Sequence, residues 1–345
     1  MSGFTGTFDV EQIAASGNNH YVNLNRSGAV QGSASANWIV NGLDSTSRGQ
    51  LGYAGTVDGA TVKLGSLSST NAFGTLRNAT ASTTATFEIG ALGSSTAFSG
   101  QIINGTGTTA LTKVGGGTLT LTASSTYTGL TTISAGVLKL DGAGAIGSTI
   151  IDVASGTFDV STINGGMYTL ASGKTIRGNG TVLGNMTVQG TLSPGESPGQ
   201  LTANGNVTLS GDYKAEIAGA GAGTGYDQLL VTGSNHTVTL GGTLTVSDPS
   251  YTPSSSDMFW VVLNNDPTNT LSGVFSNYAT SGSPITGIPT LTGYSVYYNA
   301  DSTTNSLTGG NDVVIAIPEP AALTMLFVAL AAMGGWTIVR KQRDK

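Results

Sequence analysis

Apolar and polar side chains alternate with a period of two through the middle of the chain. This alternation is typical of β-strands, because successive side chains of a strand point to opposite faces. Threonine, lysine and aspartate fill the intervening positions. We therefore expect short strands with one buried face and one solvated face. The clearest apolar pairs are Leu119 and Leu121, Leu138 and Leu140, and Phe158 and Val160.

A glycine opens each of these strands and recurs at a nearly constant distance. Gly117 begins GTLTL, Gly136 begins GVLKL and Gly156 begins GTFDV, at almost equal steps. Weaker copies follow at Gly190 and Gly242. A period of roughly 20 residues is too short for helical-hairpin repeats of about 33 residues or propeller blades of about 40. It fits one coil of a parallel β-helix.

The predicted fold is all-β, a right-handed parallel β-helix or β-solenoid. Each coil contacts only its neighbours, and a thin apolar column runs along the axis. Glycine at the bends tolerates positive φ. Threonine and asparagine side chains are expected to stack from one coil to the next. Such a fold needs few charges.

The pattern divides the chain into four parts. Residues 1–96 contain strand-like segments with worn repeats, which we interpret as degenerate coils, with a separate β-sandwich as the alternative. Residues 97–246 carry the clear repeats. Residues 247–316 are punctuated by proline, which predicts a terminal β cap. Residues 317–345 differ from everything before them.

The final part contains a long apolar segment followed by basic residues. Residues 321–339 carry no charge, and as a helix this segment would span about 28 Å. This predicts one transmembrane helix. The basic residues fix its orientation, with the C-terminus cytoplasmic and the body outside the cytoplasm. They are Arg340, Lys341, Arg343 and Lys345.

Composition indicates a sparsely charged, acidic body. Only 9% of the residues are charged, 52 are glycine and none is cysteine, so disulfides and thiolate metal sites are excluded. Residues 1–317 carry 17 acidic and 9 basic side chains. An acidic surface of this kind argues against nucleic-acid binding, which needs basic patches.

Candidate catalytic residues are few and scattered. His20 and His236 lie far apart in the sequence. Asp152 and Asp159 fall on two successive coils, and we expect both to be solvated surface charges with no arginine or lysine on the same rungs. The sequence therefore predicts a protein that is not an enzyme.

Two glycine-aspartate segments, 222–230 and 309–314, each match part of a calcium-binding nonapeptide. Such repeats supply six to eight oxygens only when they are stacked in tandem. Turn chemistry accounts for both segments without a metal. We expect no metal or cofactor.

Residues 111–140, LTKVGGGTLTLTASSTYTGLTTISAGVLKL, resemble an autotransporter-associated β-strand repeat. The shared features are a K-x-G-x-G-T-L-x-L strand, a T-Y-T-G turn and a second G-x-L-x-L strand. Residues 190–211 and 223–233 resemble segments that follow such repeats. The resemblance extends over about residues 97–316 and implies a β-solenoid passenger displayed outside the cell.

The tail resembles the PEP-CTERM sorting domain of Gram-negative bacteria. Pro318, Glu319 and Pro320 precede the apolar segment and the basic end, and the three parts together carry the resemblance. In that family an exosortase in the membrane recognises the motif and removes the tail. The two prolines would hold this segment extended and accessible. The resemblance implies an inner-membrane precursor and a mature protein at the cell surface or outside the cell.

These features predict an exported, non-enzymatic cell-surface or matrix protein with a structural or adhesive role, with exopolysaccharide as a candidate partner. The alternatives are an autotransporter-like adhesin without its barrel and a carbohydrate-active β-helix enzyme. The first residues, MSGFTGTFDVEQIAASG, have neither a basic region nor an apolar core of a signal peptide. We interpret the start as misassigned or the sequence as a fragment, with unusual export as the other explanation.

Overall fold

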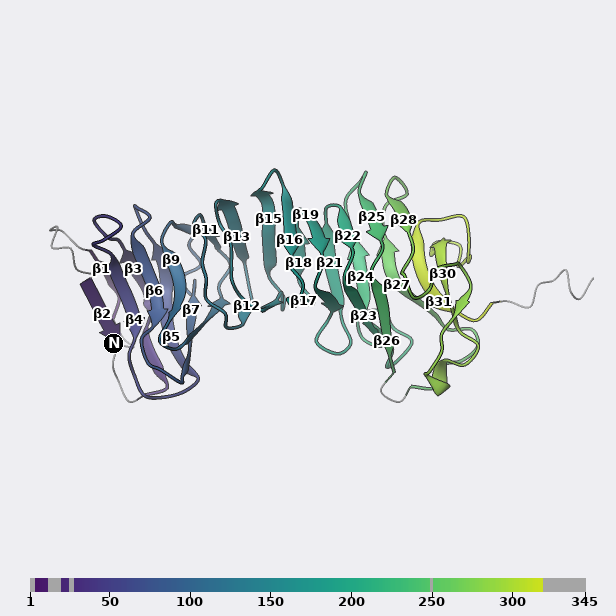
Figure 1. The fold of residues 1–345 in the computed structure, drawn as a ribbon, viewed down its shortest axis with the longest axis horizontal. Helices are drawn as coiled ribbons and strands as arrows, with labels where there is room; N and C mark the ends of the chain where they lie inside the picture. Colours follow the sequence, from purple (N-terminus) through teal and green to yellow (C-terminus); the bar gives the residue numbers. More distant parts are fainter. Residues whose placement is uncertain (1–3, 12–19, 25–27, 249–250, 319–345) are drawn as a thin grey trace, which may run out of the picture.

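The chain folds as an elongated stack of β-strand coils (Figure 1). A computed structural model describes residues 4–11, 20–24, 28–248 and 251–318. Within these residues the regular structure is almost all strand, and the one helix is a short 3-10 turn, η1 (Pro289–Leu291). The prediction of an all-β fold is confirmed.

The first of two long sheets runs the length of the solenoid. It has 11 strands, and neighbouring strands along it pair in parallel. Its strands in spatial order are β1 (Gly6–Val10), β3 (Val30–Val40), β5 (Ala60–Ser68), β7 (Thr84–Ile89), β10 (Thr108–Lys113), β12 (Thr131–Ile133), β14 (Ile150–Asp152), β17 (Thr175–Gly178), β20 (Thr191–Pro194), β23 (Asp212–Glu216) and β26 (Thr243–Ser247).

The second long sheet is parallel from β8 to β27 and antiparallel beyond. Its strands in spatial order are β8 (Thr96–Phe98), β11 (Thr118–Leu121), β13 (Val137–Gly142), β15 (Thr157–Ile163), β18 (Thr181–Leu183), β21 (Gln200–Asn204), β24 (Gln228–Val231), β27 (Met258–Asn264), β31 (Asp312–Ala316), β30 (Ser295–Ala300) and β29 (Ser283–Pro284).

Two smaller parallel sheets supply a third side, one in the N-terminal part of the stack and one from its middle toward its C-terminal end. One contains β2 (His20–Leu24), β4 (Gly49–Tyr53), β6 (Gly74–Asn78) and β9 (Gln101–Gly105). The other contains β16 (Met167–Leu170), β19 (Asn185–Val188), β22 (Val207–Leu209), β25 (Thr237–Leu240) and β28 (Thr270–Gly273).

The register of the sheets gives the length of each coil. Leu111 pairs with Thr131, and Thr131 pairs with Ile151, so these two coils are equal in length. The coil from Thr175 to its partner Thr191 is shorter, and other coils are longer. The fixed period seen in the sequence therefore holds for some coils and not for others: the coil from Thr191 to its partner Asp212 keeps it closely, although it lies outside the clear repeats. Variable bends separate strands that still pair in register.

One apolar column fills the stack. A single cluster of buried side chains extends from Val10 to Ile315. All six side chains of the predicted apolar pairs belong to it, as expected from their period-two spacing: Leu119, Leu121, Leu138, Leu140, Phe158 and Val160. The threonines beside Leu119, Thr118 and Thr120, are only partly buried.

The two weaker copies of the repeat lie on a different side of the coil from the clear ones. Gly190 and Gly242 precede β20 and β26, which belong to the first long sheet, whereas Gly117, Gly136 and Gly156 precede strands of the second. The interpretation of all five as copies of one strand is therefore wrong. The same short pattern suits both sides of the coil, since both sides bury one face of a strand.

The stack changes its pairing near the C-terminal end of the described chain. Strand β27 pairs parallel with β24 on one side and antiparallel with β31 on the other, and β30 and β29 continue antiparallel. In Figure 1 these strands form the yellow-green end of the molecule. The handedness of the coil and the domain boundaries remain predictions.

Among the described residues, no helix combines the length and apolar character needed to cross a membrane. The predicted transmembrane helix, residues 321–339, lies outside them.

Candidate functional site

Most of the predicted sorting residues lie outside the described part of the chain. Pro318 is described and exposed, and it lies shortly beyond the end of β31. The strand thus ends at Ala316, and Ile317 separates it from the motif. The residues outside the description are Glu319, Pro320, Arg340, Lys341, Arg343 and Lys345.

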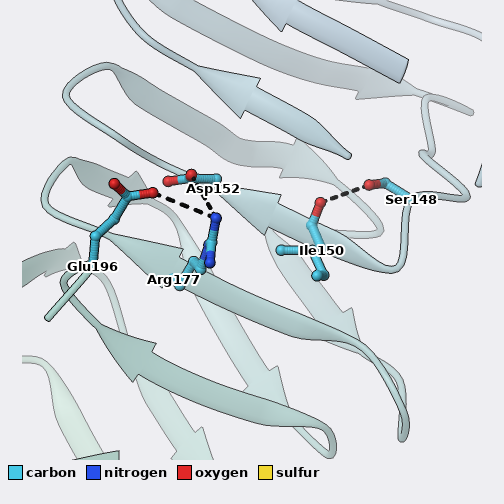
Figure 2. Close-up of polar contacts among 5 residues, drawn as sticks. All are labelled: Ser148, Ile150, Asp152, Arg177 and Glu196. Carbon is cyan, nitrogen blue, oxygen red and sulfur yellow. Dashed lines mark hydrogen bonds and ion pairs between the residues drawn. The ribbon is translucent and has the colours of Figure 1, made fainter. Parts of the chain in front are cut away.

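Three charged side chains from successive coils meet on the first long sheet (Figure 2). Asp152 ends β14, and its register partner on β17 is Arg177. The Arg177 Nη2 atom lies 3.2 Å from Asp152 Oδ2 and 3.4 Å from Glu196 Oε1, which follows β20. The expectation that Asp152 is a solvated charge with no base on its rung is therefore wrong. The base was missed because a whole coil of sequence separates the two partners.

This charge cluster has an asymmetric environment. The Asp152 side chain is 5% exposed, whereas that of Glu196 is 56% exposed. Burial, and then the neighbouring Glu196 carboxyl, raise the pKa of Asp152 to about 6, although Arg177 opposes the rise. Asp152 Oδ1 and Arg177 Nε are buried and have no hydrogen-bond partner. The Arg177 guanidinium thus lies between two carboxylates, and its contacts with both connect three successive coils.

The bend that leads into β14 is fixed by a serine. The Ser148 Oγ atom lies 2.7 Å from the carbonyl oxygen of Ile150 (Figure 2). It also lies 2.7 Å from the carbonyl oxygen of Gly129 on the preceding coil. This holds β14, and with it Asp152, in register with the next coil.

Asp159 is also more buried than expected, at 9% exposure. Its carboxylate accepts hydrogen bonds from the Ser161 backbone amide at 3.0 Å and the Ser161 hydroxyl at 2.6 Å. The Asp159 carboxylate is therefore bound by the local turn, and the prediction that it is a solvated surface charge is wrong.

The lysine of the repeat motif is buried and binds backbone. Lys113 is 1% exposed, and its Nζ donates to the carbonyl oxygens of Val114 at 2.7 Å, Gly115 at 2.8 Å and Ala135 at 3.3 Å. Burial lowers its pKa to about 8. Because Ala135 belongs to the next coil, the ammonium joins two bends. The sequence identified this lysine only as part of a motif.

The two glycine-aspartate segments compared with calcium repeats place their aspartates against backbone amides. Asp227 and Asp312 are each at most 4% exposed, and each carboxylate accepts two backbone N–H groups at 2.8–3.0 Å. Burial raises the pKa of both, that of Asp227 to about 6. Within the described residues, no group of three or more His, Asp or Glu side chains is arranged to hold a metal. The donors are Gly199 and Glu216 for Asp227, and Asn264 and Ser302 for Asp312.

The two histidines lie on the third side of the stack, at different ends. His20 begins β2, and His236 immediately precedes β25. The backbone amide of His236 donates to Asn269 Oδ1 at 2.8 Å, and its ring Nε2 lies 3.3 Å from Asn204 Oδ1. His236 therefore has polar partners within the stack.

A polar pocket of about 540 Å³ opens near the C-terminal end of the stack. Its walls come from the bend between β27 and β28 and from the turn that joins β30 to β31. Asparagine and aspartate predominate among the lining residues. Sequence reasoning missed this pocket because its two walls are far apart in the sequence.

The fold defines the class of the protein as an all-β solenoid built from long parallel sheets. Residues 111–140 match the Passenger-associated-transport-repeat family, which confirms the resemblance found in the sequence. In the structure this segment forms β10 to β13 and contributes two strands to each long sheet.

Part of the chain is also similar in sequence to a bacterial adhesin. The chain is 33% identical over 129 residues to the adhesin BmaC autotransporter of Brucella suis biovar 1 (strain 1330). The similar part covers 35% of this chain and 4% of that adhesin. The chain thus matches only a small part of the length of this curated relative.

Proposed function

We propose that the chain is a surface-displayed, adhesin-type β-solenoid with a structural or adhesive role and no catalytic activity. The observation that carries this proposal is the position of the passenger-type repeat. Residues 111–140 lie within an uninterrupted parallel stack that continues on both sides. Passenger-type coils in a long stack suit display, because each coil adds surface without needing a wider core.

The proposal that the protein has no catalytic activity is supported by the contacts of its buried charged side chains. Asp152, a carboxyl whose pKa is raised toward the range useful for acid–base work, is bound to Arg177. Lys113 and Asp227 bind backbone groups. These groups hold the coils together, which is a sufficient reason for their perturbed pKa values, since structural networks also shift pKa.

The C-terminal tail is proposed to sort the protein. In this account residues 321–339 hold the precursor in the inner membrane, and the basic residues keep the C-terminus in the cytoplasm. An exosortase then recognises Pro318, Glu319 and Pro320 and removes the tail. The mature solenoid acts at the cell surface or outside the cell, where exopolysaccharide is the proposed partner.

Processing can be tested by expressing the full chain in a Gram-negative host with and without its exosortase. We expect a shorter protein, lacking the apolar segment by mass spectrometry, only when the exosortase is present. Replacing both Pro318 and Pro320 by alanine should block the shortening, because the segment then loses its extended form. The same replacement at Pro284 and Pro289, in the cap, is the control. Identical C-terminal masses in both hosts would contradict the sorting proposal.

A further inference from the structure

The polar pocket near the C-terminal end has the size of a ligand site. Its volume of about 540 Å³ lies within the range of about 300–1,000 Å³ that small-ligand pockets occupy. Its walls are formed by the residues that follow β27, the start of β28 and the β30–β31 turn, at the yellow-green end of Figure 1.

Two asparagines of the wall have unused hydrogen-bonding capacity in a fixed orientation. Asn264 donates its amide to the carbonyl oxygen of Asn311, so its Oδ1 is identified as the atom without a partner. Asn269 accepts the His236 amide at Oδ1, so its Nδ2 is the atom without a partner. Asn264 and Asn269 are 5% and 3% exposed. A buried polar atom without a hydrogen-bond partner destabilises the fold. A ligand that forms hydrogen bonds with both atoms removes this cost, which contributes favourably to its binding free energy.

The charges of the pocket restrict the ligand. Asp266, Asp301 and Asp312 line it, and its lining contains no lysine or arginine. Hydrogen bonds from neighbouring threonines lower the pKa of Asp266 and Asp301, so both are ionised at neutral pH. Like charge therefore opposes an anionic ligand. The Asp312 oxygens each accept a backbone amide, which leaves them poorly suited to bind a metal.

Hydroxyl groups complement this lining well. Each hydroxyl offers one donor and two acceptor sites, so it can donate to a carboxylate or an amide oxygen while it accepts from an amide N–H. We propose that the pocket binds a neutral saccharide, as a chain end or short segment of a neutral polysaccharide. The free Asn264 oxygen accepts from one hydroxyl, and the free Asn269 amide donates to another.

This inference adds a ligand class to the adhesive role proposed above. Its test uses purified protein and is independent of display, so either proposal can fail without the other. The full chain, in a detergent without a sugar headgroup, is titrated calorimetrically with cellotriose, maltotriose and tri-N-acetylchitotriose. Trigalacturonic acid serves as the anionic comparison and CaCl₂ as the metal probe.

The blocking variant is Asn265→Trp. Asn265 is exposed, lines the pocket and directly follows β27, so an indole there fills the pocket without entering the core. The matched control is Gln189→Trp, since Gln189 is exposed and directly follows β19, away from the pocket. We expect at least one neutral trisaccharide to bind the wild type, at least tenfold weaker binding to Asn265→Trp, and unchanged binding to Gln189→Trp.

A second variant tests the amide wall itself. Asn269→Asp keeps the acceptor that His236 uses and removes the free donor. Losing one such bond should weaken saccharide binding about tenfold.

The proposal is overturned if no neutral probe binds at millimolar concentration, if trigalacturonic acid binds as well as the neutral probes, or if CaCl₂ alone binds and Asn265→Trp abolishes that binding. Equal binding to Asn265→Trp and wild type would also overturn it.

Discussion

At the scale of single residues, a few polar side chains bind the backbone groups that the coil bends leave unpaired. Asn185 Oδ1 accepts the amide of Asn206, and Asn206 Oδ1 accepts the amide of Thr237, both at 2.8 Å. This asparagine stack confirms the expected contacts from rung to rung. Buried charged side chains such as Lys113 and Asp227 also form hydrogen bonds with backbone groups at the bends. These bonds stabilise the fold, because a buried backbone group without a partner destabilises it.

The pH dependence of stability tests the role of Asp227. Its pKa of about 6 in the folded chain exceeds the usual value of 3.8, so the folded state binds more protons between these pH values. Stability is therefore expected to fall as pH rises from 4 to 6, by at most about 3 kcal/mol from this group. Denaturant titrations of the full chain across this range measure the slope.

Asp227→Asn should reduce that slope, because it removes the buried carboxyl that binds the additional proton in the folded state. A slope that Asp227→Asn leaves intact would assign the titration to another group, with Asp152 the next to test.

Lys113 offers a second residue-scale prediction. Lys113→Met keeps the length of the side chain but leaves three carbonyl oxygens without their donor. We expect a loss of about 1–3 kcal/mol in the free energy of unfolding. The matched control is Lys139→Met on β13, because Lys139 is partly exposed. Equal losses in the two variants would show that the backbone contacts of Lys113 are unimportant.

At the scale of the coil, stacked bends demand glycine. Gly136 has a φ of +63°, and a Cβ built on it would lie 2.4 Å from the carbonyl oxygens of Gly115 and Gly117 on the preceding coil. Bends of successive coils therefore approach closer than a side chain permits. Gly142 also has a positive φ, of +59°, but nothing lies within 4 Å of its Cβ position.

These two glycines form a matched pair. Gly142→Ala should cost about 1–2 kcal/mol, which is the penalty for a left-handed backbone conformation alone. Gly136→Ala adds a clash with two backbone oxygens, and we expect it to cost at least about 2 kcal/mol more. Thermal or denaturant unfolding of the full chain compares them. Similar losses would mean that adjacent coils do not pack as closely as the structure indicates.

The same scale explains how much the sequence could predict. Period-two alternation identified the buried faces at Leu119 and Leu138, because only local geometry sets which side chains of a strand share a face. It could not identify Arg177 as the partner of Asp152. That pairing depends on the length of the coil between them, and coil length varies with the bends.

The polar pocket was unpredictable for a similar reason. Asn264 and Asp312 meet only after the chain reverses direction through β30 and β31. Nothing in the period of the coils indicates that reversal. The prolines of residues 247–316 predicted a change of structure there but gave no partners.

At the scale of the whole molecule, a thin continuous core supports a long polar exterior. The apolar cluster reaches from Val10 to Ile315, so the coils share one core. A stack of this kind presents an extended surface with few charges, and it ends in a pocket lined with hydrogen-bonding groups. Both features suit a protein that works by contact with polymers or surfaces.

Exposure at the cell surface is the central claim, and labelling of intact cells tests it most directly. An epitope tag inserted after Gly165, a bend with open space around it, should leave the coils intact. The tagged full chain is expressed in a Gram-negative host with an exosortase, and antibody binding is compared before and after permeabilisation. The account predicts equal labelling, while a periplasmic marker is labelled only after permeabilisation. Labelling of the tag that requires permeabilisation would contradict the account.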